Sequence, residues 1–141
     1  MKKIAVMQPY FFPYLGYYQL FNCVDEFIFF DDANYFKKGF INNNYFVLSG
    51  IKTKFTIPIK NASQNRSINQ HEYIKDRFIK KFLNSVYLNY KQSKQFKYIF
   101  NIIDQIFDTD NLNVADLNIT TITKIFQYLN INKKFFKSSD I

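Results

Sequence analysis

KIAVMQPYFFPYLGYYQLFNCVDEFIFFDD, residues 3–32, has the pattern of a βαβ unit. Residues 3–7 form a short apolar run, which favours a strand buried on both faces. Two prolines in residues 8–14 each lack a backbone donor and disfavour helix at the preceding residue, so an ordered loop is predicted there. Apolar residues recur at helical spacing over 15–24, and a second apolar run at 27–30 predicts another strand. This order of elements predicts a parallel sheet.

The rest of the chain predicts a hairpin and then a group of helices. Strands are expected at 45–48 and 54–59, joined by a turn at Ser49-Gly50, and 60–70 has the composition of a mobile polar loop. Apolar residues at helical spacing predict one helix from Glu72, a second around 96–107 and a third that begins near Asn118 or Thr120. Residues 135–139 resemble a further strand. The predicted fold is therefore an α/β Rossmann-like parallel sheet with a β-hairpin insertion and a helical second half.

The length and composition predict one globular domain over residues 1–141. The chain is 48% hydrophobic and 21% aromatic, which excludes disorder as its main state. No apolar run approaches the roughly 20 residues that span a bilayer, so neither membrane insertion nor a signal peptide is expected. The single cysteine, Cys23, is expected to be buried on the first helix, and the single histidine, His71, to be exposed. No metal site is predicted, and a reducing cytoplasm is the expected location.

The positive charge of the chain is concentrated in its middle third. Residues 51–100 carry a net +9, whereas residues 1–50 carry 0 and 101–141 carry −1. These cations fit either the solvated face of surface helices or a surface that binds anions. The aromatic residues likewise allow base stacking, but Phe, Tyr, Lys, Asn and Ile are also the residues of AT-rich codons. Nucleic acid is therefore retained only as an alternative partner.

Polar side chains follow both strands of the predicted βαβ unit. Gln8 follows the first strand and Asp31 and Asp32 follow the second, where open parallel sheets bind ligands. An alternative for Gln8 is a bond to nearby backbone. On an extended chain, Asp31 and Asp32 would point in opposite directions. One carboxylate is therefore expected to face the ligand, while the other caps a backbone end or pairs with Lys37 or Lys38.

The same segment resembles the WbqC-like protein family. The resemblance rests on residues 7–20, Val24-Asp25, Asp31-Asp32, 35–44 and 56–59, and it extends to about Ile131. It implies a bacterial cytoplasmic protein of O-antigen or other surface-polysaccharide biosynthesis. Family members are thought to attach an amino acid such as glycine, or a similar acyl group, to a nucleotide-linked amino sugar. The sequence does not identify a cofactor.

The resemblance gives each candidate residue a role. Gln8, Tyr14, Tyr17 and Gln19 would line the sugar or nucleotide pocket, Lys37 and Lys38 would meet phosphate, and Asp32 with Asn42 would orient the acceptor amine. Residues 13–17 also align with the His-x-Gly-His loop of Rossmann-like nucleotidyl transferases, with tyrosines in the histidine places. The predicted catalytic residues are Asp32, Tyr17 and Asn42, and the predicted substrate-binding residues are Gln8, Pro9, Tyr14, Gly16, Gln19, Asp31, Lys37, Lys38 and Asn44.

The chain also departs from the family pattern. Asn43 stands where relatives usually have Arg, and Phe82 where they have a helical His. Relatives are also longer, so this chain is expected to be truncated at its C-terminus and to expose an apolar sheet edge that invites self-association. The alternatives to a transferase are a protein that binds nucleic acid or an anionic surface, and a non-catalytic remnant or partner subunit.

Overall fold

A computed structural model of the chain describes residues 1–75 and 77–141. A three-stranded parallel sheet in the order β1-β2-β5 is formed by Ile4–Met7, Glu26–Phe29 and Lys134–Lys137. Helix α1, Leu15–Cys23, connects β1 to β2, so the predicted βαβ unit and parallel sheet are confirmed.

The second half of the fold is a hairpin and three further helices. Strands β3, Asn43–Leu48, and β4, Ile51–Thr56, pair antiparallel. Ser49 and Gly50 both have positive φ, 50° and 78°, as a tight hairpin turn requires. Helices α2, Arg77–Tyr90, α3, Phe96–Phe107, and α4, Val114–Tyr128, follow. The predicted hairpin and helical second half are therefore confirmed.

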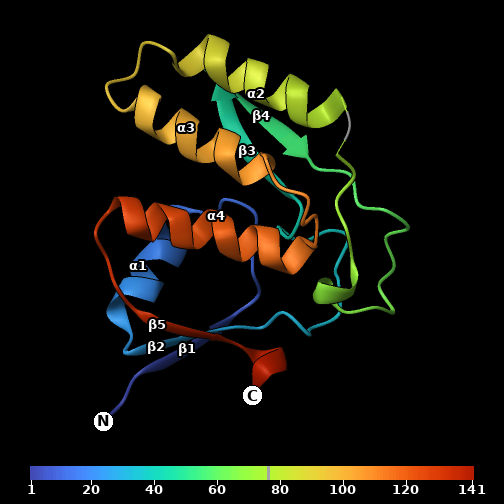
Figure 1. Cartoon of the computed structure of the whole chain (residues 1–141), viewed down its shortest axis with the longest axis vertical. Helices are drawn as coiled ribbons and strands as arrows, with labels where there is room; N and C mark the ends of the chain where they lie inside the picture. The colour runs from blue at the N-terminus through green and yellow to red at the C-terminus, as the bar shows by residue number, and fades with distance from the viewer. Residues whose placement is uncertain (76) are drawn as a thin grey trace.

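The elements stack in layers along the long axis of the molecule. In Figure 1 the sheet lies at the bottom, α1 and α4 lie above it, and α2, α3 and the hairpin lie at the top. One apolar cluster fills the space between the sheet, α1 and α4. A second cluster joins the hairpin, α2, α3 and the first turn of α4. Helix α4 contributes buried residues to both clusters.

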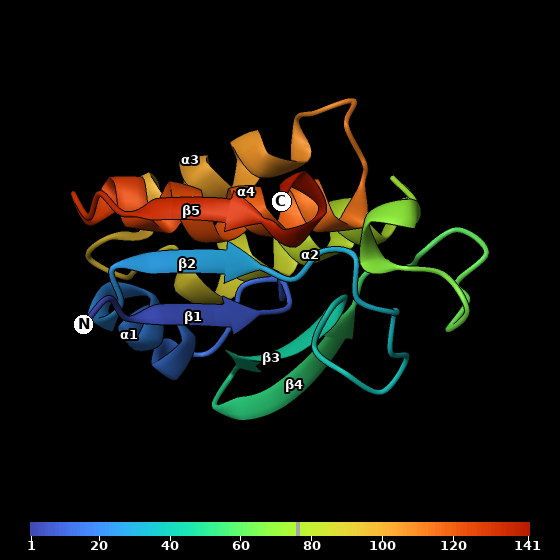
Figure 2. The same ribbon diagram turned by 90° about the horizontal axis from the view of Figure 1, so that it is seen from below.

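The prediction that β1 is buried on both faces is wrong. Ile4 and Val6 are 51% and 52% exposed, whereas Ala5 between them is 9% exposed. Figure 2 shows the reason, because no helix lies in front of this face of the sheet. Val6 lies in register with Ile28, and Ile28 with the exposed Phe136, so an apolar row crosses the open face. Strand β5 is at one edge of this sheet, and the predicted self-association through an edge stays a prediction.

Three predicted boundaries also differ from the structure. Helix α2 begins at Arg77 rather than at Glu72, because Glu72 and Tyr73 form isolated bridges with Asn113 and Ile59. Helix α4 begins at Val114, four residues or more before the predicted start, because the Asn113 side chain caps it by accepting a hydrogen bond from the Asp116 amide. The second hairpin strand occupies 51–56 instead of 54–59.

The loop that was expected to be mobile contains regular structure. Residues Ile68–Gln70 form a 3₁₀ turn that carries a capping box with Ser67. Within residues 1–75 and 77–141, no helix combines the length and the apolar character needed to cross a bilayer.

Candidate functional site at the carboxyl ends of the parallel strands

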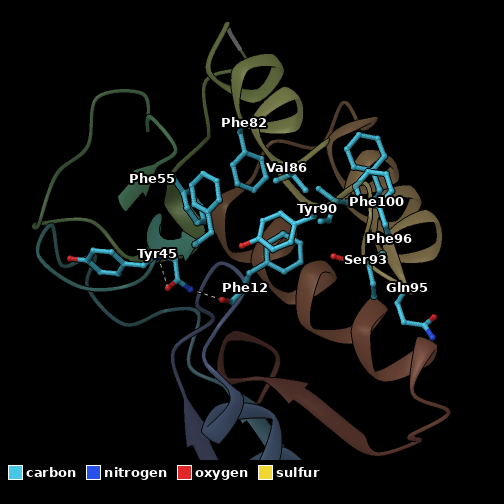
Figure 3. Close-up of a pocket in the computed structure, with 14 residues that line it drawn as sticks. Phe12, Tyr45, Phe55, Phe82, Val86, Tyr90, Ser93, Gln95, Phe96 and Phe100 are labelled. Carbon is cyan, nitrogen blue, oxygen red and sulfur yellow. Dashed lines mark hydrogen bonds between the residues drawn. The ribbon is translucent and has the colours of Figure 1, made fainter. Parts of the chain in front are cut away.

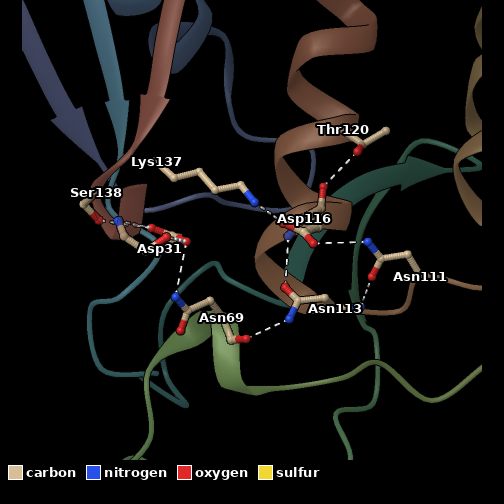
Figure 4. A network of polar contacts seen from close by, with 9 residues as sticks. Asp31, Asn69, Asn111, Asn113, Asp116, Thr120, Lys137 and Ser138 are labelled. Carbon is tan, nitrogen blue, oxygen red and sulfur yellow. Dashed lines mark hydrogen bonds and ion pairs between the residues drawn. The ribbon is translucent and has the colours of Figure 1, made fainter. Parts of the chain in front are cut away.

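The carboxyl ends of β2 and β5 meet in one polar cluster, which includes Asp31, Asn69, Asp116, Lys137 and Ser138 (Figure 4). Strand β2 leads into Asp31, and β5 leads into the short 3₁₀ turn Ser138–Asp140. Because all three strands are parallel, Gln8 after β1 lies at this same edge of the sheet. This is the edge at which open α/β sheets bind ligands.

Asp31 is the anchor of the cluster. Its side chain is only 1% exposed and accepts hydrogen bonds from the Ser139 hydroxyl at 2.7 Å and the Ser139 amide at 3.1 Å. The Ser138 hydroxyl and the Asn69 amide donate two more, at 3.1 and 3.3 Å. Burial alone would raise the pKa of this carboxyl, but the four donors outweigh burial and hold the pKa below 3.8. Asp31 is therefore ionised at neutral pH, and its lone pairs are occupied.

Asp32 is exposed and accepts one hydrogen bond, from the Ser138 hydroxyl. The prediction that Asp31 and Asp32 face opposite ways is wrong, because the chain turns after β2 and both carboxylates contact the same Ser138 hydroxyl. Their expected pairing with Lys37 or Lys38 is also wrong, since both lysines are exposed and neither forms an ion pair within residues 1–75 and 77–141. Within residues 1–75 and 77–141, Asp32 is thus an exposed carboxylate with a single hydrogen bond, whereas Asp31 is buried and accepts four.

An ion pair at the start of α4 completes the cluster. The Lys137 ammonium lies 2.6 Å from an Asp116 carboxylate oxygen, and about a third of each side chain is exposed. Burial would raise the pKa of Asp116, but the hydrogen bonds from Lys137 and Asn111 lower it below its ordinary value. The same hydrogen bond to Asp116 raises the pKa of Lys137. The Asn113 amide donates to the Asn69 carbonyl at 2.7 Å, which ties the cap of α4 to the 3₁₀ turn 68–70.

The loop after β1 is held by buried side chains. The Tyr17 hydroxyl is buried in the core and donates to the Gln8 carbonyl at 3.0 Å. Burial raises the pKa of Tyr17 far above its usual value, so its proton is retained at neutral pH. The Asn118 amide donates to the Pro9 carbonyl at 2.9 Å. The Gln8 side chain makes no hydrogen bond within residues 1–75 and 77–141, so its amide remains free to meet a ligand.

The other predicted site residues are buried, bonded to the loop after β1, or exposed on α1. Asn42 is buried, where it accepts from the Tyr35 hydroxyl at 2.9 Å and donates to the Ile57 carbonyl at 2.8 Å. Asn44 donates to the Phe11 and Phe12 carbonyls and so braces the loop from its far side. Tyr14, the residue just before α1, is 63% exposed. Its ring lies so close to Gly16 that a Cβ at position 16 would be 2.7 Å from it. Gln19 is exposed on α1.

A polar hollow of about 320 Å³ adjoins the cluster through Asn69. Its lining contains two cations, Lys60 and Arg66, one carboxylate, Glu72, and also Asn113. Its size lies within the range typical of small-ligand sites, about 300–1,000 Å³. Sequence reasoning missed this hollow and also missed Ser138, Ser139, Lys137, Asp116 and Asn69.

The expectations for His71 and Cys23 are both wrong. His71 is only 1% exposed. Its two ring nitrogens contact the Ser63 amide at 3.1 Å and the Ser67 carbonyl at 2.7 Å, so both have partners inside the protein. Cys23 ends α1 and is exposed. Within residues 1–75 and 77–141, no three His, Cys, Asp or Glu side chains are grouped so that they could hold a metal ion.

Comparison with known proteins identifies the family. The model of the WbqC-like protein family matches residues 8–141. The chain belongs to the WbqC-like family. The family is associated with surface-polysaccharide biosynthesis.

One protein similar to this WbqC chain comes from Mycobacterium tuberculosis and is named "Uncharacterized protein Rv1507c". It is 28% identical over 147 residues, which cover 99% of this chain and 62% of the relative. The chain therefore spans about three fifths of the length of that relative. No solved structure matches.

Two residues that depart from the pattern expected from the resemblance, Asn43 and Phe82, are buried. Asn43 donates to the Gly39 carbonyl at 2.6 Å. Phe82 is 7% exposed and packs against Phe55 and Phe46. Both side chains therefore fill structural positions in this WbqC chain, and the catalytic roles of Tyr17 and Asn42 stay predictions.

Replacement of Asp31 tests the anchor of the cluster. We expect Asp31→Asn to lower the free energy of unfolding at pH 7 by about 2 kcal/mol, because hydrogen bonds to charged groups contribute roughly 1.5–3 kcal/mol. The folded-state pKa of Asp31 lies below its ordinary value, so its stabilisation is complete above about pH 5 and is lost progressively as the pH falls through the unfolded-state and then the folded-state pKa. Urea denaturation of both proteins from pH 7 to pH 3 measures this difference. A constant difference across that range would contradict the assignment, and Asp110→Asn, an exposed aspartate, is the control.

Proposed function

We propose that this chain acts in surface-polysaccharide biosynthesis as a transferase that joins an amino acid or similar acyl group to a nucleotide-linked amino sugar. The observation that carries the proposal is the meeting of an ionised, fully bonded Asp31 with an exposed Asp32 at the carboxyl ends of β1, β2 and β5. Ligands bind at that edge in open α/β sheets. Membership of the WbqC-like family supports the reaction class.

Asp32 is the carboxylate that meets the substrate amine in this proposal. The Ser138 hydroxyl, which also contacts Asp31, holds it in place, and its free oxygen accepts a hydrogen bond from the amino group of the sugar. The nitrogen lone pair then forms the new C–N bond with the acyl carbon, the bond from that carbon to its leaving group breaks with its electron pair, and the proton that the nitrogen loses passes to the departing group. Orientation of the amine accounts for the expected gain in rate.

The remaining residues bind the nucleotide sugar. The free amide of Gln8 is suited to a sugar hydroxyl, and exposed Lys37 and Lys38 are suited to the diphosphate. The polar hollow, in which the cations Lys60 and Arg66 outnumber the single carboxylate Glu72, offers a second surface for phosphate. Tyr17 acts by positioning Gln8, whose carbonyl it holds, and Asn42 by positioning the strand that carries Asn44.

A panel of nucleotide-linked amino sugars tests the proposal. We expect a nucleotide amino sugar to raise the melting temperature, because a ligand at a hundred times its Kd stabilises the folded state by about 2.7 kcal/mol. Asp32→Asn should retain the wild-type melting temperature without ligand, and it should lower the rate of amide formation about a hundredfold or more. Asp110→Asn is the matched control and should leave both unchanged.

Two results would overturn the proposal. One is the absence of any shift with every nucleotide amino sugar while a longer family member responds under the same conditions. The other is equal amide formation by wild type and Asp32→Asn.

A further inference from the structure

A second hollow, of about 330 Å³, lies away from the polar cluster, between the hairpin and helices α2 and α3. Figure 3 shows that Phe55 of β4, Phe82 and Val86 of α2, and Phe96 and Phe100 of α3 line it. Its lining runs from Phe12 in the loop after β1 to Gln95 before α3. It falls at the small end of the range for small-ligand sites, about 300–1,000 Å³, which is too small for a peptide helix.

Two polar side chains in the lining of this apolar pocket, Tyr90 and Asn44, are already bonded within the protein, and two others, Ser93 and Gln95, are exposed at its edge. The Tyr90 hydroxyl donates to the Val47 carbonyl at 2.7 Å and accepts from the Val47 amide at 3.0 Å. The Asn44 side chain bonds the Phe11 and Phe12 carbonyls and the Tyr45 amide. The interior therefore offers no group to a charged or hydrogen-bonding ligand, since burial of an unpaired polar group is costly. A hydrocarbon chain meets no such penalty.

Backbone strain is found in the wall of the same pocket. Phe12 has a φ of +43°, in the left-handed region that residues with a side chain seldom adopt. Asn44 holds this conformation through the Phe12 carbonyl. Glycine would adopt this φ without strain, so the aromatic ring is kept at an energetic cost. Such strain tends to gather at ligand sites.

The pocket reaches the surface at the connection between α2 and α3. Ser93 and Gln95 line it there, and Lys91 and Lys94 flank Ser93 on this exposed connection. Within residues 1–75 and 77–141 the ion pairs are Lys2–Glu26 and Lys137–Asp116, so neither of these lysines is neutralised by a carboxylate. A ligand with its chain in the pocket would place its head group at the segment that carries Lys94, the chain neighbour of Ser93, and Lys91, whose ammonium lies 5.9 Å from the centre of the Tyr87 ring. Charge complementarity therefore favours an anionic head.

We propose that this pocket binds the hydrocarbon chain of a single-chain anionic amphiphile, a medium-chain fatty acid or fatty acyl compound, with its head group at Lys91 and Lys94. This site is independent of the proposed transferase function and goes beyond it. The apolar lining accounts for the chain, and the two lysines at the opening account for the anion.

The absence of tryptophan from the chain allows a direct test. A single tryptophan introduced as Phe96→Trp would lie in the pocket wall, and 12-bromododecanoic acid would quench its fluorescence on contact. We expect saturable quenching that unlabelled dodecanoic acid reverses. Leu88→Trp is the matched control, because Leu88 is 66% exposed on α2 and does not line the pocket, so its tryptophan should not be quenched. Absent quenching in Phe96→Trp, or equal quenching in both proteins, would overturn the proposal.

Further variants in the Phe96→Trp background measure separately how the hydrocarbon chain and the head group of the ligand contribute to binding. Val86→Phe should fill the pocket and weaken binding of bromododecanoic acid at least tenfold, and Ile99→Phe serves the same purpose if the first variant does not fold. Lys91→Gln with Lys94→Gln should weaken dodecanoic acid severalfold and leave dodecanol unchanged. Displacement by p-cresol but not by dodecanoic acid would assign an aromatic ligand and overturn the proposed hydrocarbon chain.

Discussion

Asn118→Leu is expected to lower the free energy of unfolding by about 3 kcal/mol. Asn118 is fully buried on α4 and donates to the Pro9 carbonyl at 2.9 Å and the Ile41 carbonyl at 2.7 Å, while it accepts from the Tyr73 hydroxyl at 2.8 Å. Leucine leaves the Pro9 carbonyl without this donor, and a buried unsatisfied group costs about 1–3 kcal/mol in addition to the lost hydrogen bonds. The Tyr73 hydroxyl can turn to the Ile41 carbonyl, which lies 3.1 Å away, and this limits the loss.

Urea denaturation at pH 7 measures this effect, and Gln127→Leu supplies the control. Gln127 carries the same amide on an exposed turn of α4, so its replacement should change the free energy of unfolding by no more than about 0.5 kcal/mol. Tyr73→Phe combined with Asn118→Leu should cost less than the sum of the single changes, because the two side chains share one network. Equal stability of Asn118→Leu and Gln127→Leu would show that this network contributes nothing.

Phe11→Ala is expected to lower the free energy of unfolding by about 3–5 kcal/mol, the usual cost of a buried phenylalanine. The Phe11 side chain is completely buried, and its ring centroid lies 4.8 Å from Phe12, 5.7 Å from Phe55 and 5.8 Å from Phe107. Removal of the ring leaves a cavity between the loop after β1 and the second apolar cluster. Phe11→Leu should recover part of the loss, because leucine fills some of that volume.

Thermal and urea unfolding compare Phe11→Ala with Phe36→Ala, a control at a phenylalanine that is 53% exposed. The control should stay within about 0.5 kcal/mol of the wild type. A loss below 1 kcal/mol for Phe11→Ala would mean that the loop is not anchored through this ring.

Local sequence patterns were enough to predict the βαβ unit and the hairpin. The apolar runs are short and bounded by polar or proline residues, and Ser49-Gly50 can adopt the positive φ values of the turn. These signals depend on neighbours in the chain. The family resemblance rested on equally local motifs.

Contacts between distant segments determined the features that the sequence did not reveal. Ser138 and Ser139 bond to Asp31 although they lie 107 and 108 residues from it in the sequence, so no local pattern predicts the cluster. Asparagine is common at the start of a helix, so Asn118 was predicted to begin one. In the structure it lies inside α4 and bonds two carbonyls that are 77 and 109 residues away. The exposed side of β1 likewise depends on which layers cover the sheet, because an apolar run is the same whether one face or both are covered.

The two-sided packing of α4 has a thermodynamic consequence. Val114, Ala115 and Leu117 belong to the cluster under the hairpin, whereas Ile122 and Phe126 belong to the cluster on the parallel sheet. The helix is thus a common wall of two cores, and neither core can open without exposing apolar surface of the other. We therefore expect the two cores to unfold together, so that a ligand that stabilises the sheet edge also suppresses opening of the hairpin side.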